Sequence, residues 1–128
     1  MQHNPVGWFE IYVEDMERAQ RFYEALLGIR MQEIDSPEGD DSDLDMLAFP
    51  SQRSASGASG ALVKMPDYLA GAGGTIVYFA CEDCAEQARL AEAHGGQIIK
   101  KKYSIAPYGF AAMVQDTEDN LIGLHSMR

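Results

Sequence analysis

The chain has 128 residues, which is room for one domain with a core of its own. Hydrophobic residues make up 46% of the sequence and charged residues 23%, which excludes a disordered or fibrous class. The formal charge of -10 excludes nucleic acid and anionic membranes as favourable partners. No apolar run reaches the roughly 18 residues of a spanning helix, and the first residues lack the layout of a signal peptide, so we expect a cytoplasmic protein.

The first segment has the pattern of a strand followed by a helix. Residues 8–13 alternate as a strand does, and apolar residues then recur at helical spacing from Met16 to Leu26. Asp15 stands at the expected N-cap and Gly28 at the expected C-cap. Three strand-like runs follow, at residues 29–34, 44–49 and 60–65.

The second half of the chain repeats this order. Sliding the first segment by 68 positions places Glu14 and Asp15 on Glu82 and Asp83, and Gly28 on Gly96. A strand and a helix are therefore expected again from residue 74. Further strand-like runs follow at residues 97–101, 110–115 and 120–125.

This repetition predicts a single α+β domain made of two tandem β-α-β-β-β modules. The modules cover residues 5–65 and 74–128, and residues 66–73 form a linker that contains Pro and Gly. One helix per module covers only one face of its strands. We therefore expect a curved mixed sheet that encloses a cleft on the face away from the helices.

Two other stretches carry groups that can react or bind metals, and each also has a structural explanation. Cys81 and Cys84 have C-x-x-C spacing, which fits either a redox pair or a small core residue and the first turn of a helix. Two thiols alone cannot complete a four-ligand zinc site. The acidic run at 35–45 lacks the residue order of a calcium-binding loop, so we expect a solvated hairpin loop there.

Several short motifs resemble those of a known superfamily. The first module contains V-x-D at residues 13–15, F-Y at 22–23 and L-G at 27–28. The final run DTEDNLIGLH, at 116–125, is similar to a terminal D-P-x-G-N-x-x-E-L motif. On these motifs the chain resembles the vicinal oxygen chelate superfamily, which includes glyoxalase I, bleomycin-resistance proteins and ring-cleaving dioxygenases. The resemblance implies the fold more specifically than the activity, because this superfamily uses one scaffold for unrelated reactions.

The resemblance also implies a divalent metal, held in the cleft by His and carboxylate side chains at four positions. In this sequence the four positions fall on Trp8, Val63, Ile76 and Gly123, with Leu62 and Thr75 as the alternatives if the alignment slips by one. Trp offers only an N–H donor, and Val, Ile and Gly have no side-chain ligand atom. We therefore expect no metal and no other cofactor. Asp119 stands where the terminal turn normally has Gly, which requires a left-handed backbone there.

Strand alternation predicts which side chains face the cleft. The expected ligand-binding residues are Trp8, Glu10, Tyr12, Val63, Ile76, Tyr78, Phe110 and Gly123, with His125 near the end of the chain. This lining is aromatic and apolar with one negative charge, a composition typical of a small-molecule pocket. Gly123 either widens the cavity or only packs within a hairpin.

Two functions remain open at this point. The first is a metal-free binding protein of the bleomycin-resistance type, which holds an aromatic or cationic molecule between Trp8, Glu10, Tyr12 and Tyr78. The second is a lyase or isomerase of the glyoxalase family, which uses Glu10 and His125 as acid and base or recruits a metal through other residues. A paired structural carboxylate and an exposed terminal His are the simpler explanations of those two residues. The resemblance also implies a homodimer, because such clefts are often completed across subunits.

Overall fold

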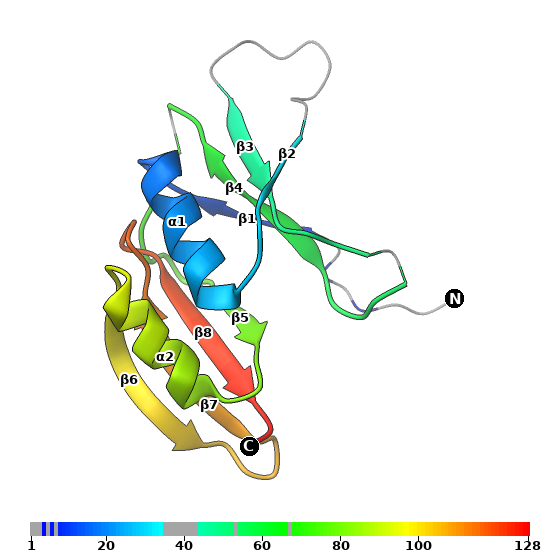
Figure 1. Ribbon diagram of the computed structural model, residues 1–128, viewed down its shortest axis with the longest axis vertical. Coiled ribbons are helices and arrows are strands. Elements are labelled where there is room, and N and C mark those ends of the chain that lie inside the picture. Colours follow the sequence, from blue (N-terminus) through cyan, green and yellow to red (C-terminus); the bar gives the residue numbers. More distant parts are fainter. Residues whose placement is uncertain (1–3, 5, 7, 35–43, 53, 67) are drawn as a thin grey trace.

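The computed structural model describes residues 4, 6, 8–34, 44–52, 54–66 and 68–128, and the structural statements below concern these residues. Two helices and eight strands follow one another in the order expected for two β-α-β-β-β modules (Figure 1). The first module contains β1 (Trp8–Tyr12), α1 (Met16–Leu27), β2 (Gln32–Glu33), β3 (Asp45–Ala48) and β4 (Ser59–Lys64). The second contains β5 (Val77–Ala80), α2 (Cys84–Ala93), β6 (Gln97–Ser104), β7 (Phe110–Gln115) and β8 (Leu121–Ser126).

Both helices begin at the aspartates predicted from the sequence. The Asp15 side chain accepts a hydrogen bond from the Arg18 amide at 3.1 Å, and the Asp83 side chain accepts one from the Ala85 amide at 3.0 Å. Helix α1 ends at Gly28, whose φ of 64° lies in the left-handed region that a C-cap glycine adopts without strain.

The strands form two four-stranded mixed sheets. The strand order is β1-β4-β3-β2 in the first sheet and β5-β8-β7-β6 in the second. The pairs β1–β4 and β5–β8 are parallel, and all other neighbouring strands are antiparallel. The predicted α+β fold of tandem modules is therefore confirmed. Instead of one continuous curved sheet, however, β1 and β5 each form the edge of a separate sheet in the described part of the chain.

Aromatic side chains join the two sheets where backbone hydrogen bonds do not. The ring of Phe9 on β1 lies 6.1 Å from that of Phe79 on β5, and both rings contact Phe49. Tyr23 of α1 packs edge-on against Phe49 at 5.7 Å and is fully buried. These rings keep the two edge strands apart and give both modules one shared core.

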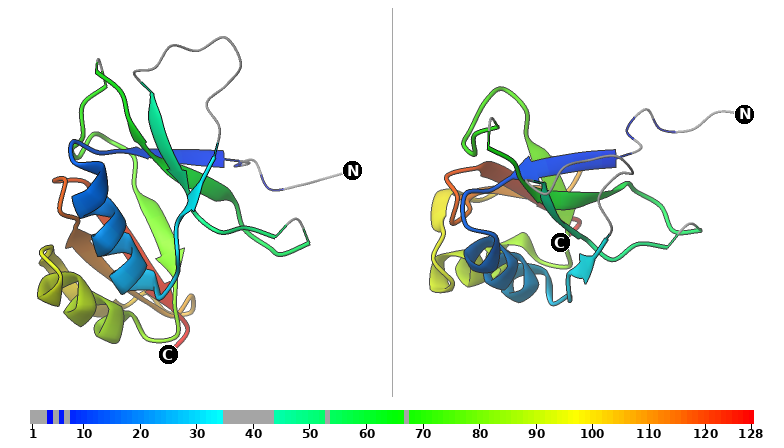
Figure 2. Two further views of the ribbon diagram at one scale, coloured as in Figure 1. Left: turned by 45° about the horizontal axis from the view of Figure 1, so that its top comes forward. Right: turned by 90° about the horizontal axis from the view of Figure 1, so that it is seen from above.

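The helices lie side by side on one side of the molecule, as Figures 1 and 2 show. Helix α2 packs on the second sheet, whereas α1 packs against β4 and α2. The core therefore lies between the helices and the sheets, and the opposite sheet faces carry the candidate site. No helix in the described ranges is long and apolar enough to cross a membrane.

Two strands, β2 and β6, differ from the prediction by more than one residue at an end. The run at 29–34 forms a strand only at Gln32–Glu33, because Ile29 and Met31 pack against the core and the Met31 amide donates to Oε2 of Glu24 at 2.9 Å. Strand β6 extends to Ser104 instead of residue 101, since Ser104 still pairs with Phe110 across the hairpin. The predicted acidic loop at 35–45 lies mostly outside the described residues.

Candidate functional site

The outward face of β1 carries three side chains that are joined by hydrogen bonds. Nε1 of Trp8 donates to Oε2 of Glu10 at 3.2 Å, and the Tyr12 hydroxyl donates to Oε1 of Glu10 at 2.7 Å. Their neighbours Ile11 and Val13 point the other way and are buried in the core. Strand alternation therefore brings the three predicted residues together, and 47% of the Trp8 surface remains exposed.

In the part of the chain that the structure describes, Glu10 has two neutral donors and no cationic partner. Among the residues that the structure describes, no Lys, Arg or His forms an ion pair with its carboxylate. Burial and the neighbouring Glu10 carboxylate raise the pKa of Tyr12 to about 12, so the phenol keeps its proton at neutral pH and remains a donor. Two hydrogen bonds thus orient the Glu10 carboxylate, and none of the described residues supplies a counter-charge.

The linker crosses over this part of β1. The Tyr68 ring stacks on the Tyr12 ring with 5.2 Å between centroids, and the Tyr68 amide donates to the Met65 carbonyl at 3.1 Å. Further along, the Gly71 amide donates to Oδ1 of Asn120 at 2.7 Å. These contacts hold the described part of the linker, residues 68–73, beside the Glu10 carboxylate.

A cavity of about 180 Å³ lies between β1, the linker and the start of the second module. It is lined by Glu10, Ile11, Tyr12, Leu69, Gly71, Ala72, Gly73, Thr75, Val77, Asn120, Leu121 and Ile122. Sequence reasoning found Glu10 and Tyr12 but missed the linker residues. Their Pro and Gly content indicates only an irregular connection and carries no signal about where that connection lies in the fold.

Gly123 does not widen a cavity, which corrects one of the two expectations for this residue. A Cβ atom built on Gly123 would lie 2.3 Å from Cδ2 of Tyr78, its parallel partner on β5. The Tyr78 ring crosses the glycine, and its hydroxyl lies 3.6 Å from Sδ of Met113. The space left by the missing side chain is filled by this aromatic ring, 51% of whose residue surface remains exposed.

Three other predicted lining residues lie elsewhere. Val63 is only 1% exposed, so it does not reach an open cleft. Ile76 precedes β5 and is exposed. Phe110 packs against the core, with Nζ of Lys102 4.7 Å from its ring centroid. Alternation gives the face of a strand but not the neighbours that cover it, so a ligand-binding role for these three residues stays a prediction.

His125 is held by a backbone group. Its Nε2 lies 2.6 Å from the carbonyl oxygen of Tyr108, which accepts the hydrogen bond from the ring. No hydrogen bond joins His125 to Glu10 within the described residues. An acid and base pair of these two residues therefore stays a prediction that the contacts do not support.

The two cysteines have the environment of structural residues. Cys84 is fully buried, and burial raises the pKa of the half-buried Cys81 thiol to about 11. A thiol with a raised pKa forms little thiolate at neutral pH and is a poor nucleophile. These values favour the small core residue over the redox pair.

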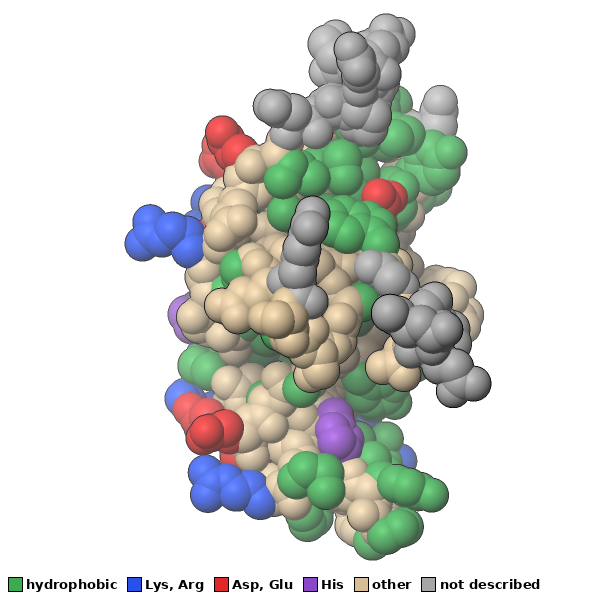
Figure 3. Space-filling view, turned by 90° about the vertical axis from the view of Figure 1, so that its right-hand side faces the viewer, with side chains coloured by type: hydrophobic (Ala, Val, Ile, Leu, Met, Phe, Trp, Pro, Cys, Tyr) green, Lys and Arg blue, Asp and Glu red, His purple; other side chains and the backbone are tan. Residues whose placement is uncertain are grey.

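Hydrophobic side chains reach the surface over both sheets on the side of the molecule shown in Figure 3. The large exposed hydrophobic residues of the chain include Trp8, Tyr68, Leu69, Ile76, Tyr78 and Tyr108. Of these, Trp8 is hydrogen-bonded to Glu10, Leu69 lines the same cavity as Glu10, and Tyr68 stacks on Tyr12.

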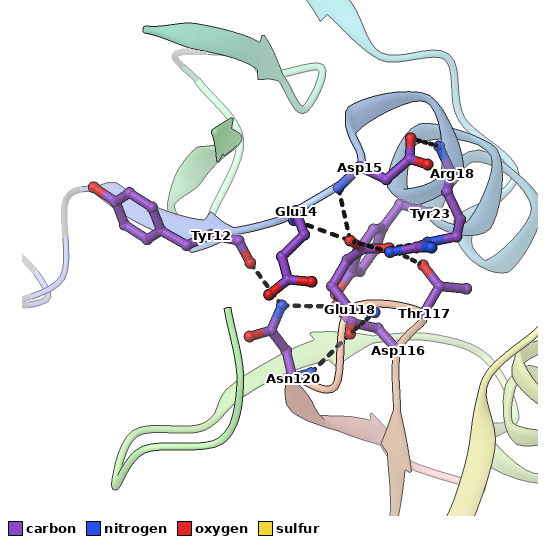
Figure 4. Close-up of polar contacts among 9 residues, drawn as sticks. All are labelled: Tyr12, Glu14, Asp15, Arg18, Tyr23, Asp116, Thr117, Glu118 and Asn120. Carbon is purple, nitrogen blue, oxygen red and sulfur yellow. Dashed lines mark hydrogen bonds and ion pairs between the residues drawn. The ribbon is translucent and has the colours of Figure 1, made fainter. Parts of the chain in front are cut away.

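The turn between β7 and β8 binds the two modules together (Figure 4). Its Glu118 side chain is buried and accepts hydrogen bonds from the amides of Glu14 and Asp15 and from Nε of Arg18 at 2.7 Å. Burial raises the pKa of Glu118, but these hydrogen bonds outweigh it and lower the value to about 2. Glu118 thus serves as an ionised anchor for the junction between β1 and α1.

Asp116 and Asn120 complete this connection. Oδ2 of Asp116 accepts a hydrogen bond from the Tyr23 hydroxyl at 2.6 Å and another from the Asn120 amide group at 3.0 Å. The same amide group donates to the Tyr12 carbonyl at 2.9 Å. Between them, Asp119 has a φ of 67°, the left-handed conformation predicted for it. Asn120 therefore links this turn, the end of β1 and, through Gly71, the linker.

Comparisons with known proteins find a similar sequence in one family and the same fold in solved structures. Residues 6–39 match the family described as bleomycin resistance protein-like N-terminal. The solved structure of TnmS3, an antibiotic binding protein from Streptomyces sp. CB03234, is similar over 98% of both chains, with a TM-score of 0.65 and 21% identity. A glyoxalase/bleomycin resistance protein/dioxygenase superfamily member from Sphaerobacter thermophilus DSM 20745 is similar over 97% of this chain and 98% of its own, with a TM-score of 0.68 and 18% identity.

Glyoxalase I from Zea mays is similar over 96% of this chain, with a TM-score of 0.71 and 17% identity, and the match covers 46% of the maize protein. The chain thus spans about half the length of that enzyme. No curated protein matches the sequence. The chain has the vicinal oxygen chelate fold. The resemblance predicted from its sequence motifs is therefore confirmed.

The residues present do not fit the metal that is implied by the vicinal oxygen chelate fold. Trp8 has only an N–H donor and Gly123 has no side chain, while Val63 and Ile76 are hydrocarbons. Leu62, the alternative to Val63, is a fully buried hydrocarbon as well. Across the described ranges, no group of three or more His, Cys, Asp or Glu side chains is placed to hold a metal ion. We therefore derive no chemical step through a metal.

Proposed function

We propose that this protein binds a small aromatic or cationic molecule on the outward face of β1, without a metal at the four family positions. The observation that carries this proposal is the Glu10 carboxylate, which two aromatic donors orient and which no cation from the described residues neutralises. A cation that enters the cavity gains the Coulomb attraction of the Glu10 carboxylate. The Trp8 indole beside the carboxylate offers an exposed aromatic surface to the rest of the ligand.

Two further facts support binding rather than catalysis. The formal charge of -10 attracts cations toward the protein. The similar structure from Streptomyces is that of an antibiotic binding protein, so the same fold holds a small molecule in at least that case. The likeness to glyoxalase I from Zea mays supports a lyase or isomerase in the same way, but the contacts described above do not pair Glu10 with His125 as an acid and a base.

The Glu10→Gln variant tests this proposal. Gln keeps the shape of the side chain but removes the negative charge, so affinity for aromatic cations should fall by about tenfold or more. Thermal shift identifies binders from a panel of aromatic cations, neutral compounds and anions, and calorimetry then measures their affinities. Glu33→Gln, an exposed acid on β2, serves as the matched control. Equal affinity in wild type and Glu10→Gln would overturn the proposal.

We also propose that the chain acts as one cytoplasmic domain, with modules at 5–65 and 74–128 and a linker at 66–73, and that two copies form a homodimer. The exposed aromatic residues near the edge strands β1 and β5 support an interface there. Sedimentation velocity should give twice the mass of the chain at micromolar concentration. A monomer at all concentrations would contradict the dimer without affecting the binding proposal.

A further inference from the structure

The linker forms a wall of the Glu10 cavity, and this has a consequence for which ligand can bind. We infer that residues 68–73 belong to the binding site and that the site selects a small organic ammonium ion, with Leu69 covering its apolar part. This inference rests on the proposed function and deepens it, because it names the ligand class and the residues that set the size limit.

Contacts on both sides hold the linker over the cavity. Tyr68 stacks on Tyr12, whose hydroxyl is bound to Glu10, and the Gly71 amide is bound to Asn120. Asn120 also donates to the Tyr12 carbonyl, so one side chain fixes the spacing between the linker and β1. The opening of the cavity is therefore set by Asn120 and by the stacked tyrosines.

The polar atoms of the cavity favour a ligand that donates hydrogen bonds. A carboxylate has about four lone-pair sites, and Trp8 and Tyr12 use one each, which leaves acceptor capacity on Glu10. The Tyr12 hydroxyl and the Asn120 amide are already committed to other acceptors. A primary ammonium group matches this set because it carries both the charge and the N–H donors. A quaternary ammonium supplies only the charge.

The size and the remaining walls define the rest of the ligand. The cavity of about 180 Å³ is partly open to solvent and lies below the roughly 300–1,000 Å³ of typical drug pockets. Its other walls are mainly apolar and include Leu69, Val77, Leu121 and Ile122. Leu69 is 82% exposed, so it can bury considerable surface against a ligand. A compact ammonium ion with one small apolar group meets these limits.

Titration calorimetry with benzylammonium tests the inference on the full-length protein. Benzyl alcohol, which lacks the charge, and benzyltrimethylammonium, which lacks the N–H donors, should each bind about tenfold or more weakly. Leu69→Ala should weaken benzylammonium binding by about five- to twentyfold, because it removes apolar contact from a site that is otherwise intact. Tyr68→Ala should weaken binding as well, since the linker loses its stacking contact.

Ile99→Ala, at an exposed leucine-sized residue of β6, is the control and should leave affinity unchanged. The outcomes separate the two proposals. Binding that depends on Glu10 but is unchanged in Leu69→Ala and Tyr68→Ala overturns the role of the linker and leaves the proposed function standing. Equal affinity for benzylammonium and benzyltrimethylammonium overturns the ammonium selectivity. Binding to no member of the wider aromatic panel overturns the proposed function itself.

Discussion

Tyr78 and Gly123 behave as one unit across two parallel strands. The resemblance to the vicinal oxygen chelate superfamily implies a metal-binding carboxylate at the position of Gly123, and here the Tyr78 ring covers the glycine and its hydroxyl reaches Met113. The loss of a side chain on one strand is thereby matched by an aromatic ring on its neighbour. A ligand that approaches this face meets the Tyr78 ring, 51% of whose residue surface is exposed.

Gly123→Ala tests this packing. The added Cβ atom would lie well inside contact distance of three Tyr78 ring atoms, so the ring must move and the variant should lose about 1–3 kcal/mol of stability. Urea unfolding measures the change. Gly73→Ala is the control, because no atom lies within 4 Å of a Cβ atom at that position and its φ is not positive. In Tyr78→Ala the same Gly123→Ala change should cost much less; an equal cost in both backgrounds would show that the ring is not the obstacle.

At the scale of elements, the turn between β7 and β8 does more than connect two strands. Asp116, Glu118 and Asn120 bind the first module at α1, at the junction before it and at the end of β1. The D-P-x-G-N type motif that marks the family is therefore structural in this chain. It sets the position of β1, and with it the position of Glu10, relative to the second module.

Glu118→Gln should destabilise the protein by about 2–4 kcal/mol. The substitution leaves the junction amides and the Arg18 guanidinium without their anionic acceptor in a buried site. Glu86→Gln is the control, since Glu86 and Arg89 form an exposed pair within α2 and its loss should change stability by less than about 0.5 kcal/mol. Chemical denaturation of both variants gives the comparison.

The same anchor makes stability depend on pH. The pKa of Glu118 falls from its usual 4.5 to about 2 on folding, so its contribution is present above pH 4.5 and is lost as the pH falls toward 2. The loss is on the order of 3 kcal/mol. Burial raises the pKa of Asp116, so its buried carboxylate lowers the stability of the fold at neutral pH. This destabilisation lessens as Asp116 takes up a proton in acid. The melting temperature should therefore fall less steeply below pH 4.5 in Glu118→Gln than in wild type, and parallel curves would contradict this.

At the scale of the whole molecule, the two sheets share a core although no backbone pairing between described residues joins them. One cluster of buried residues includes Ile11 and Leu62 from the first module and Val114 and Leu124 from the second. The Glu118 anchor and the Phe9–Phe79 contact add to this connection. Neither module keeps its apolar surface covered without the other.

The protein should therefore unfold in a single transition. Calorimetry should give an enthalpy equal to the van't Hoff enthalpy, because exposing one module exposes the core of the other. Two separate transitions, or a stable fragment containing residues 74–128 alone, would show that the modules are independent units. A dimer would make the midpoint rise with protein concentration but would keep the transition single.

The sequence by itself determined the elements and their order. Alternation along β1 and helical spacing after Asp15 are local patterns. Asp15 and Asp83 cap the starts of α1 and α2, and Gly28 caps the end of α1, each through groups within about one turn. The repeat at an offset of 68 positions then gave the paired modules. The same patterns placed Trp8, Glu10 and Tyr12 on one face, because side chains two residues apart in a strand always share it.

Only the tertiary structure decided what covers those faces. Tyr78 fills the space at Gly123, and Leu69 is one of the residues that line the cavity beside Glu10. Phe110 is partly buried against the core. Glu118 likewise shows its role only when residues about 100 positions earlier lie beside it. Local patterns follow from backbone geometry, whereas the identity of a neighbour across the fold depends on how all the elements pack at once.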